Sequence, residues 1–236
     1  MTSKSIIQVA NLNNTSALAS VQHASIQEIG GDQVFLVLRI LDMTPSMDPY
    51  IDEMIKAERE NIKALTDSSD VAEFLISTWL FNSQNGFVVL DGFVPLADVT
   101  PLTRSIYQTA GMTNLYDTVY TALKDDKAGV LAYANTLHLS GITPKVAVGI
   151  FTDGADNRSS IDPSQIKSQI SLAEGYYFTL FAFGTDFGQQ AATAMGIPNV
   201  LEHDAKPGAI RKMMGTFSKS VVRASQTTVA PNSFIA

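Results

Sequence analysis

Short runs of apolar residues alternate along this chain with longer segments in which apolar residues recur every three or four positions. The first run, residues 34–41, is rich in Val, Leu and Ile and is apolar at both odd and even positions. Such a run is typical of a strand that is buried on both faces, as in a parallel sheet. The next segment, residues 49–65, carries apolar residues at helical spacing, which predicts an amphipathic helix.

The same alternation continues toward the C-terminus. It predicts further strands over residues 72–81, 86–94, 145–151, 176–183 and 199–202. It predicts further helices over residues 103–110, 115–139 with a break near Gly129, 163–174, 187–195 and 208–222. Strands that alternate with helices favour an α/β fold, namely a doubly wound, mostly parallel central sheet with helices on both faces.

The polar ends of the chain set the expected limits of the domain. Residues 1–30 are polar and weakly patterned, so we expect a loosely structured N-terminal extension. Residues 31–225 contain all the strongly patterned segments and are expected to form one domain, followed by a polar C-terminal tail over residues 226–236. No stretch of linker composition divides the region in between.

Composition narrows the classes of function. The chain has 16 Lys and Arg against 23 Asp and Glu, a net charge of −7, so binding to the phosphate backbone of nucleic acids is not expected. It has no cysteine, which excludes disulfides, thiolate metal sites and thiol nucleophiles, and its three histidines lie far apart in the sequence. No apolar run is long enough for a membrane helix and no signal-peptide pattern is seen, so the expected location is the cytoplasm.

Two aspartates come at the ends of predicted buried strands. Asp42 follows the strand at residues 34–41, and Asp153 follows the strand at residues 145–151. In a doubly wound sheet, ligands bind beyond the carboxyl ends of the strands. Both carboxylates are therefore expected at the same edge of the sheet, although 111 residues separate them in sequence.

Further side-chain oxygens accompany these carboxylates. Asp42, Thr44 and Ser46 occupy alternate positions, so their side chains point the same way in an extended turn. Asp153 would add a second carboxylate and Thr113 another hydroxyl from neighbouring loops. Because hard cations such as Mg²⁺ take oxygen ligands and keep several waters, these residues predict a small divalent-cation site.

The first of these segments resembles part of the metal-ion-dependent adhesion site (MIDAS) of the von Willebrand factor type A (VWA) family. The family motif is Asp-x-Ser-x-Ser, and here it reads Asp42-x-Thr44-x-Ser46, in which Thr keeps the hydroxyl. Pro45 stands where Gly is usual in the family.

Two further segments strengthen this resemblance. The second family motif, a lone Thr in a Gly-x-Thr-Asn-Leu-Tyr context, is matched by Thr113, and the third, Thr-Asp-Gly, by residues 152–154. The resemblance extends over roughly residues 33–222 and includes the order of strands and helices.

The resemblance implies a metal-dependent protein-binding module rather than an enzyme, with no catalytic residues. The metal ligands that it implies are Asp42, Thr44, Ser46, Thr113 and Asp153. In the family, the bound cation usually coordinates an acidic residue of a protein partner. A small site with hydroxyl ligands favours Mg²⁺, with Mn²⁺ and Ca²⁺ as alternatives.

The resemblance also bears on partners and on conformational change. Free-standing VWA proteins often act in multiprotein complexes, for example beside AAA+ ATPases, so a subunit of this kind is an expected partner, and neither nucleic acid nor membrane is expected. The net charge of −7 opposes an acidic partner, except at short range, where the charge of the cation dominates. In some members the last helix shifts when ligand binds, and a shift of residues 208–222 is a hypothesis here.

Other interpretations stay open from the residues alone. Asp, Thr and Ser are common helix caps, so the Asp42 segment by itself fits a capping role. A Mg²⁺-dependent phosphohydrolase also places an Asp at a strand end, but Thr44 replaces the second Asp that such enzymes need. A metal-independent scaffold protein is a further alternative. Asp117, Asp156 and Asn157 are weaker candidates for residues that hold the metal ligands in place.

Overall fold

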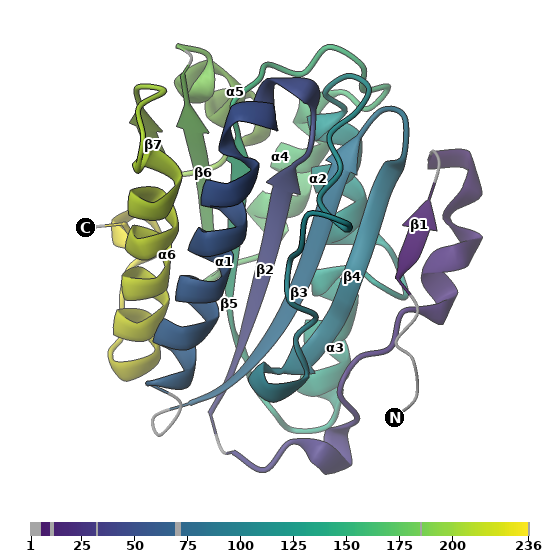
Figure 1. The fold of residues 1–236 in the computed structure, drawn as a ribbon. Coiled ribbons are helices and arrows are strands. Elements are labelled where there is room, and N and C mark those ends of the chain that lie inside the picture. The colour runs from purple at the N-terminus through teal and green to yellow at the C-terminus, as the bar shows by residue number, and fades with distance from the viewer. Residues whose placement is uncertain (1–5, 10–11, 32, 69–71, 185, 236) are drawn as a thin grey trace.

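The computed structural model contains a seven-stranded sheet flanked by helices (Figure 1). It describes residues 6–9, 12–31, 33–68, 72–184 and 186–235. In chain order the strands are β1 (Ile7–Val9), β2 (Val34–Asp42), β3 (Glu73–Asn82), β4 (Gly86–Pro95), β5 (Lys145–Thr152), β6 (Tyr177–Phe183) and β7 (Asn199–His203). Their order across the sheet is β1-β4-β3-β2-β5-β6-β7. The β1–β4 and β3–β4 pairs are antiparallel and all other pairs are parallel, so the predicted mostly parallel sheet is confirmed.

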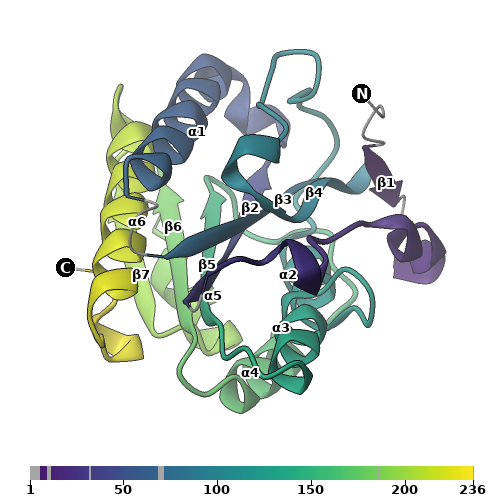
Figure 2. The same ribbon diagram turned by 90° about the horizontal axis from the view of Figure 1, so that it is seen from below.

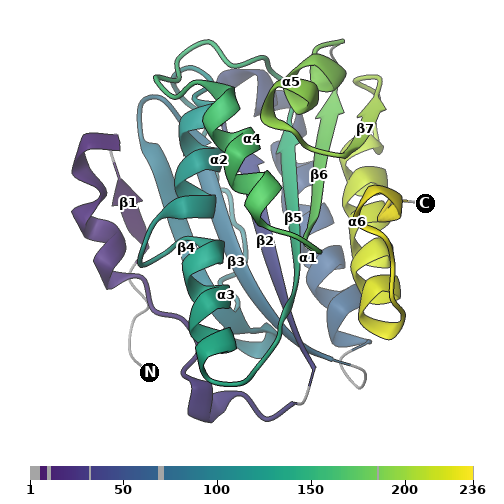
Figure 3. The same cartoon turned by 180° about the vertical axis from the view of Figure 1, so that it is seen from behind.

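Helices cover both faces of this sheet, as predicted. One face carries α1 (Ile51–Thr66) and α6 (Ala209–Gln226) (Figure 1). The opposite face carries α2 (Leu115–Lys124), α3 (Val130–Leu139), α4 (Pro163–Leu172) and α5 (Gly188–Met195) (Figure 3). Figure 2 shows the sheet between these two helical layers. Short 3₁₀ helices lie in the connections: η1 (Leu12–Ser20), η2 (Ile26–Glu28), η3 (Pro45–Tyr50), η4 (Leu96–Asp98) and η5 (Pro231–Ser233). Among the described residues, no helix has the length and apolarity needed to cross a membrane.

The central strand β2 serves two hydrophobic cores. Leu36 and Leu38 belong to the core on the α2–α5 side, whereas Phe35 and Val37 belong to the core on the α1 and α6 side. All four side chains are fully buried. A strand between two helical layers must be apolar at odd and even positions alike, which is why this segment has no polar face.

One charged residue interrupts the apolar pattern of β2. Arg39 is fully buried and forms an ion pair of 3.1 Å with Glu58 of α1. Its guanidinium also donates to the hydroxyl of Thr78, at 2.6 and 3.2 Å, and to the amide oxygen of Asn61 at 3.1 Å. The Asn61 amide in turn donates to the hydroxyl of Ser218 in α6 at 2.7 Å. This polar group therefore ties α1 and α6 to the sheet from within the core.

The predicted helix over residues 115–139 is divided near Gly129, as expected. α2 ends at Lys124 and α3 begins at Val130. A Cβ atom at Gly129 would lie 2.5 Å from the carbonyl oxygen of Asp125. The close approach of these two backbone segments therefore requires glycine.

The predicted helix over residues 103–110 is wrong. This segment is part of a loop that runs from β4 to α2 beside α1, over the same face of the sheet (Figure 1). Its single turn is closed by the N–H groups of Ile106 and Tyr107, which donate to the carbonyl of Thr103 at 3.1 and 2.8 Å. Leu102 and Tyr107 are buried in the core beside α1. Apolar residues that anchor a loop on the core produced a spacing that resembles a helix.

The segment over residues 1–30, expected to be a loosely structured extension, is anchored on the domain at several positions that the structure describes. β1 pairs with β4 opposite Phe87–Val89, and Leu18 is fully buried. Only a few isolated residues of this polar segment contact the domain. Because they are not regularly spaced, they produce no periodic pattern in the sequence. Residues 1–5 and 10–11 lie outside the described residues.

His23 is a further anchor of this N-terminal segment. Its ring stacks on that of Tyr133, with a centroid distance of 4.4 Å. Its Nδ1 atom accepts the N–H of Phe93 at 2.9 Å, and its Nε2 atom lies 2.8 Å from the carbonyl oxygen of Lys127. These contacts assign the neutral ring with the proton on Nε2, because Nδ1 already accepts a hydrogen bond.

The C-terminal tail is polar in sequence but folds back onto the domain. Phe234 is fully buried and stacks on Tyr177, with a centroid distance of 4.6 Å. The guanidinium of Arg223 in α6 donates to the carbonyl oxygens of Ser233 and Phe234 at 2.8 and 2.6 Å. The tail therefore adds one aromatic side chain to the core beside α6.

Candidate metal centre

Asp42 and Asp153 lie at the same edge of the sheet. Asp42 is the last residue of β2, and Asp153 follows β5 directly. These two strands are parallel neighbours, with Leu41 opposite Phe151 in their register. The strand order reverses its direction between β2 and β5, and this is where doubly wound sheets bind ligands.

A chain of hydrogen bonds links four of the five predicted metal ligands. The N–H of Thr44 donates to Asp42 Oδ1 at 2.9 Å. The hydroxyl oxygens of Thr44 and Ser46 lie 3.0 Å apart, and the Ser46 hydroxyl donates to Asp153 Oδ1 at 2.8 Å. The structure thus brings the two carboxylates and two of the hydroxyls together.

The fifth predicted ligand, Thr113, comes from the loop before α2 and lies against Gly154. A Cβ atom added to Gly154 would lie 3.2 Å from the hydroxyl oxygen of Thr113. The backbone of Thr113 is held by Asn157, whose amide oxygen accepts its N–H at 2.9 Å and whose N–H donates to its carbonyl at 3.0 Å. Thr113 is therefore fixed beside the loop that carries Asp153.

Two residues that were not among the predicted ligands hold Asp42 in place. The hydroxyl of Thr152 donates to Asp42 Oδ2 at 2.6 Å, and the buried hydroxyl of Tyr107 donates to the main-chain carbonyl of Asp42. Thr152 precedes Asp153 in the Thr-Asp-Gly motif, so its position could have identified it. The sequence around Tyr107 carries no such signal, because this contact depends on the path of the long loop.

The weaker candidates Asp117 and Asp156 support the loop that follows β5. Asp117 Oδ1 accepts the N–H groups of Ser160 and Ile161, both at 2.8 Å. Asp156 Oδ2 accepts the N–H of Tyr116 at 3.0 Å. Among the described contacts, neither carboxylate bonds to a predicted ligand, so both position the loop against α2.

Burial opposes ionisation of both carboxylates at the site. It raises the pKa of Asp42 to about 6, the hydrogen bonds from Thr152 and Thr44 oppose this rise, and the charge of Asp153 adds to it. Burial also raises the pKa of Asp153, against the lowering effect of the bond from Ser46. A nearby divalent cation would offset both effects, because positive charge favours the ionised form of a carboxylate.

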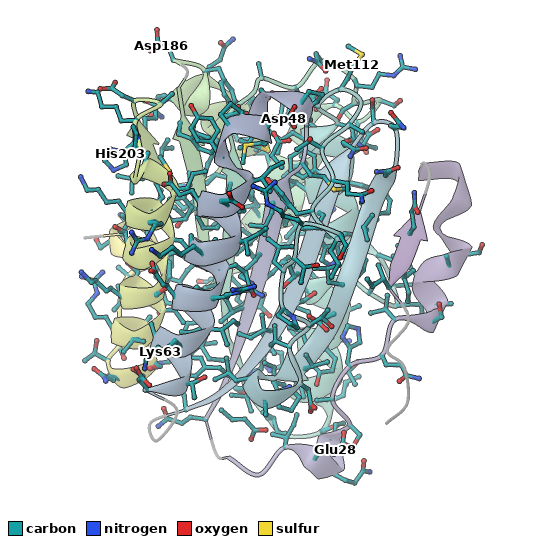
Figure 4. All side chains as sticks on the ribbon, in the orientation of Figure 1. Glu28, Asp48, Lys63, Met112, Asp186 and His203 are labelled. Carbon is teal, nitrogen blue, oxygen red and sulfur yellow. The ribbon has the colours of Figure 1, made fainter. Side chains whose placement is uncertain are left out.

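The donor atoms fit a hard divalent cation. The five side chains offer carboxylate and hydroxyl oxygens, which Mg²⁺ prefers over nitrogen or sulfur. Asp42, Thr44 and Thr113 are buried, while Ser46 is exposed, so the cluster opens to solvent on one side. Figure 4 labels Asp48 and Met112, from the loops that carry Ser46 and Thr113, at the same end of the molecule. An ion held there would keep a side free for another ligand.

Comparison with known proteins supports the fold. No family model and no curated protein matches this sequence. Similar solved structures include proximal thread matrix protein 1 (PTMP1) from the mussel byssus, with TM-scores of 0.50 and 0.51 at 12–15% identity, and one PTMP1 structure has a zinc-occupied MIDAS motif. The D319A mutant of the PilB minor pilin from Streptococcus sanguinis has a TM-score of 0.57 at 13% identity. The pilus adhesin SpaC from Lactobacillus rhamnosus GG has a TM-score of 0.57 at 9% identity.

These similarities cover most of this chain but a smaller part of each similar protein. They span 82% of this chain and 46% of PTMP1, 83% and 63% for PilB, and 86% and 31% for SpaC. The chain thus spans less than two thirds of the length of each. At these identities the shared property is the fold, which PTMP1 combines with a metal-occupied MIDAS.

Proposed function

We propose that this chain is a metal-dependent binding module whose divalent cation coordinates an acidic residue of a protein partner. The cation would be held by Asp42, Thr44, Ser46, Thr113 and Asp153. The observation that carries this proposal is the convergence of their oxygens at the edge between β2 and β5. The zinc-occupied MIDAS of PTMP1 supports a divalent cation in this fold, and the adhesin SpaC is consistent with a binding role.

The residues of the chain would hold the ion from its buried side. The carboxylates of Asp42 and Asp153 balance the charge of a divalent ion, while the hydroxyls add neutral oxygens. When bound, the cation supplies a Lewis-acidic position that attracts a carboxylate. Thr152 and Tyr107 keep Asp42 oriented through its side chain and its carbonyl. The exposed Ser46 lies at the open side, where a partner would approach.

We propose binding rather than catalysis for this site. Metal-assisted hydrolysis needs a base or nucleophile beside the ion. Among the described contacts, Asp42 and Asp153 are bonded by hydroxyls and backbone amides, and burial raises the pKa of the neighbouring Tyr107 well above its usual value. The phosphohydrolase alternative needs an Asp at position 44, where the Thr44 hydroxyl instead contacts Ser46.

The partner, the location and the identity of the ion are also part of the proposal. The VWA resemblance supports a partner within a multiprotein complex, with an AAA+ ATPase as one such subunit, and we retain the cytoplasm as the proposed location. Oxygen ligands support Mg²⁺ as the proposed ion. The hypothesis of a shifting last helix applies to α6, and it fails if structures with and without a bound partner superpose along α6.

Calorimetric titration of chelator-treated protein with Mg²⁺, Mn²⁺, Ca²⁺ and Zn²⁺ tests the metal site. We expect saturable binding that is lost in Asp42→Asn and retained in Asp48→Asn, which makes the same change at an exposed residue nearby. Equal effects of the two substitutions would contradict the site. Phosphate-ester turnover abolished by Asp42→Asn would favour the phosphohydrolase, and partner capture undiminished by chelator would favour the scaffold.

A further inference from the structure

A basic groove lies between the first turns of α1, which follows the first candidate metal-binding segment in the chain, and the loop that follows β4. Its volume is about 500 Å³, which is within the usual range for ligand-binding pockets. We call it the α1 groove. Its lining residues are Asp52, Ile55, Lys56, Arg59, Thr103 and Arg104.

Three cationic side chains and one carboxylate line the α1 groove. Asp52, Lys56 and Arg59 are spaced by four and three residues, so they share one face of α1. Asp52 is engaged by Arg104, whose guanidinium donates to both carboxylate oxygens at 2.8 and 2.5 Å. The charges of Lys56 and Arg59 are therefore not balanced by the one acidic residue of the groove.

Lys56 and Arg59 are exposed and available to a ligand. Within the part of the chain that the structure describes, neither side chain forms an ion pair or a hydrogen bond. The carboxylate of Glu60 has its pKa lowered mainly by its bond from Arg211 and to a smaller extent by Lys56. Because Glu60 is already paired with Arg211 at 2.6 Å, Lys56 keeps its capacity to bind another anion.

The wall of the α1 groove is also part of the support of the metal centre. Arg104 lies in the turn that the carbonyl of Thr103 closes with the N–H of Tyr107 at 2.8 Å. Tyr107 donates to the carbonyl of Asp42, and Ala110 donates its N–H to the carbonyl of Met43 at 3.0 Å. One loop thus connects the groove to the first metal-binding segment.

We infer that the α1 groove docks an acidic segment of the protein partner, next to the carboxylate that would reach the cation. This inference rests on the proposed function for the nature of the partner, and it adds the chemistry of the segment that flanks the coordinating residue. The chain as a whole carries a charge of −7 and repels such a segment. The two unbalanced cations provide local attraction, and Ile55 offers apolar contact for the stems of Glu or Asp side chains.

The test uses a fluorescein-labelled oligoglutamate peptide and fluorescence anisotropy, at low ionic strength and with excess chelator. Wild-type protein is compared with the double variant Lys56→Gln/Arg59→Gln and with the control Lys212→Gln/Lys219→Gln. The control changes the net charge equally through two exposed lysines of α6. Because exposed ion pairs are weak, we expect the affinity to fall only about tenfold, and in the groove variant only.

Because the chelator removes metal ions, the peptide assay measures binding to the α1 groove independently of the candidate metal centre. Equal losses in both double variants, or no binding of the peptide by wild type, would overturn docking in the α1 groove. Partner binding that needs Mg²⁺ and Asp42 but is unchanged in Lys56→Gln/Arg59→Gln would also overturn it and leave the proposed function standing. If the peptide binds through Lys56 and Arg59 while calorimetric titration detects no metal binding, the groove is supported and the proposed function is contradicted.

Discussion

The hydroxyl of Ser46 donates a 2.8 Å hydrogen bond to Asp153, a residue 107 positions further along the chain. This bond joins the turn after β2 to the loop after β5. The same hydroxyl oxygen lies 3.0 Å from that of Thr44. The side chains of the two loops are therefore already in contact with each other. A cation could bind them without first bringing the loops together.

Thr152 is expected to control metal affinity without contacting the ion. Thr152→Val keeps the shape of the side chain but removes the hydroxyl that donates to Asp42 Oδ2 at 2.6 Å. Residues that orient metal ligands typically contribute about 10- to 100-fold in affinity, and we expect a loss of this size in calorimetric titration.

A matched control for this substitution is Thr179→Val on the neighbouring strand β6. The Thr179 hydroxyl is buried and has no hydrogen-bond partner among the described residues. Its removal should leave metal affinity unchanged and should not lower the free energy of unfolding. Equal metal affinities of the two variants would show that Thr152 does not orient Asp42.

Loss of Glu58 is expected to destabilise the fold strongly. Glu58→Ala leaves the buried guanidinium of Arg39 without its ionic partner, a change that typically costs about 3–5 kcal/mol. Glu60, two residues after Glu58 in α1, forms an exposed ion pair with Arg211 of α6, and Glu60→Ala should therefore cost much less. Urea unfolding of both variants measures the difference. Similar losses would contradict a special role for the buried pair.

Acidification is expected to weaken the anchoring of the N-terminal segment at His23. Burial lowers the pKa of His23 from 6.5, against the raising effect of its bond to Lys127. The unfolded chain therefore takes up this proton at higher pH than the folded chain does. The stability contributed by the neutral ring is present above pH 6.5 and is lost as the pH falls below that value.

The free energy of unfolding of three proteins, measured from about pH 7.5 to 5.5, tests this prediction. Relative to His23→Gln, wild type should lose stability over this range, because the raised pKa values of Asp42 and Asp153 act equally in both proteins and only wild type carries His23. His138→Gln, which changes an exposed histidine, should follow wild type. A His23→Gln profile parallel to that of wild type would contradict the prediction.

Phe234 is expected to make the C-terminal tail part of the folded core. Phe234→Ala removes a fully buried ring that stacks on Tyr177, and such changes cost about 3–5 kcal/mol. Leu172→Ala removes a side chain that is 80% exposed, and should change stability by about 0.5 kcal/mol or less. Thermal unfolding of the two variants distinguishes them. A Phe234→Ala protein as stable as Leu172→Ala would place the tail outside the cooperative unit.

The elements that were predicted from the sequence are those with a local signal. The run at residues 34–41 must be apolar at every position because two cores contact it, and Arg39 is the exception whose partners come from other elements. The proximity of Asp42 and Asp153 followed from the rule that parallel strands end at one edge.

Features that depend on single long-range contacts were not predicted. Leu18 and His23 anchor the N-terminal segment as isolated residues, so no periodicity marks them. Tyr107 belongs to a segment whose spacing predicts a helix, yet its hydroxyl reaches Asp42 only because the loop takes an extended path. A pattern within one segment cannot show which distant backbone group that segment will meet.

The pairing of β1 with β4 also has a consequence for association between molecules. β1 covers the main-chain groups of Phe87–Val89, three uncharged residues of high strand propensity at the border of the sheet. Without β1, their free N–H and C=O groups would form an open template for a strand from another copy. The short N-terminal strand thus blocks edge-to-edge pairing between copies, and conditions that release it are expected to lower the solubility of the protein.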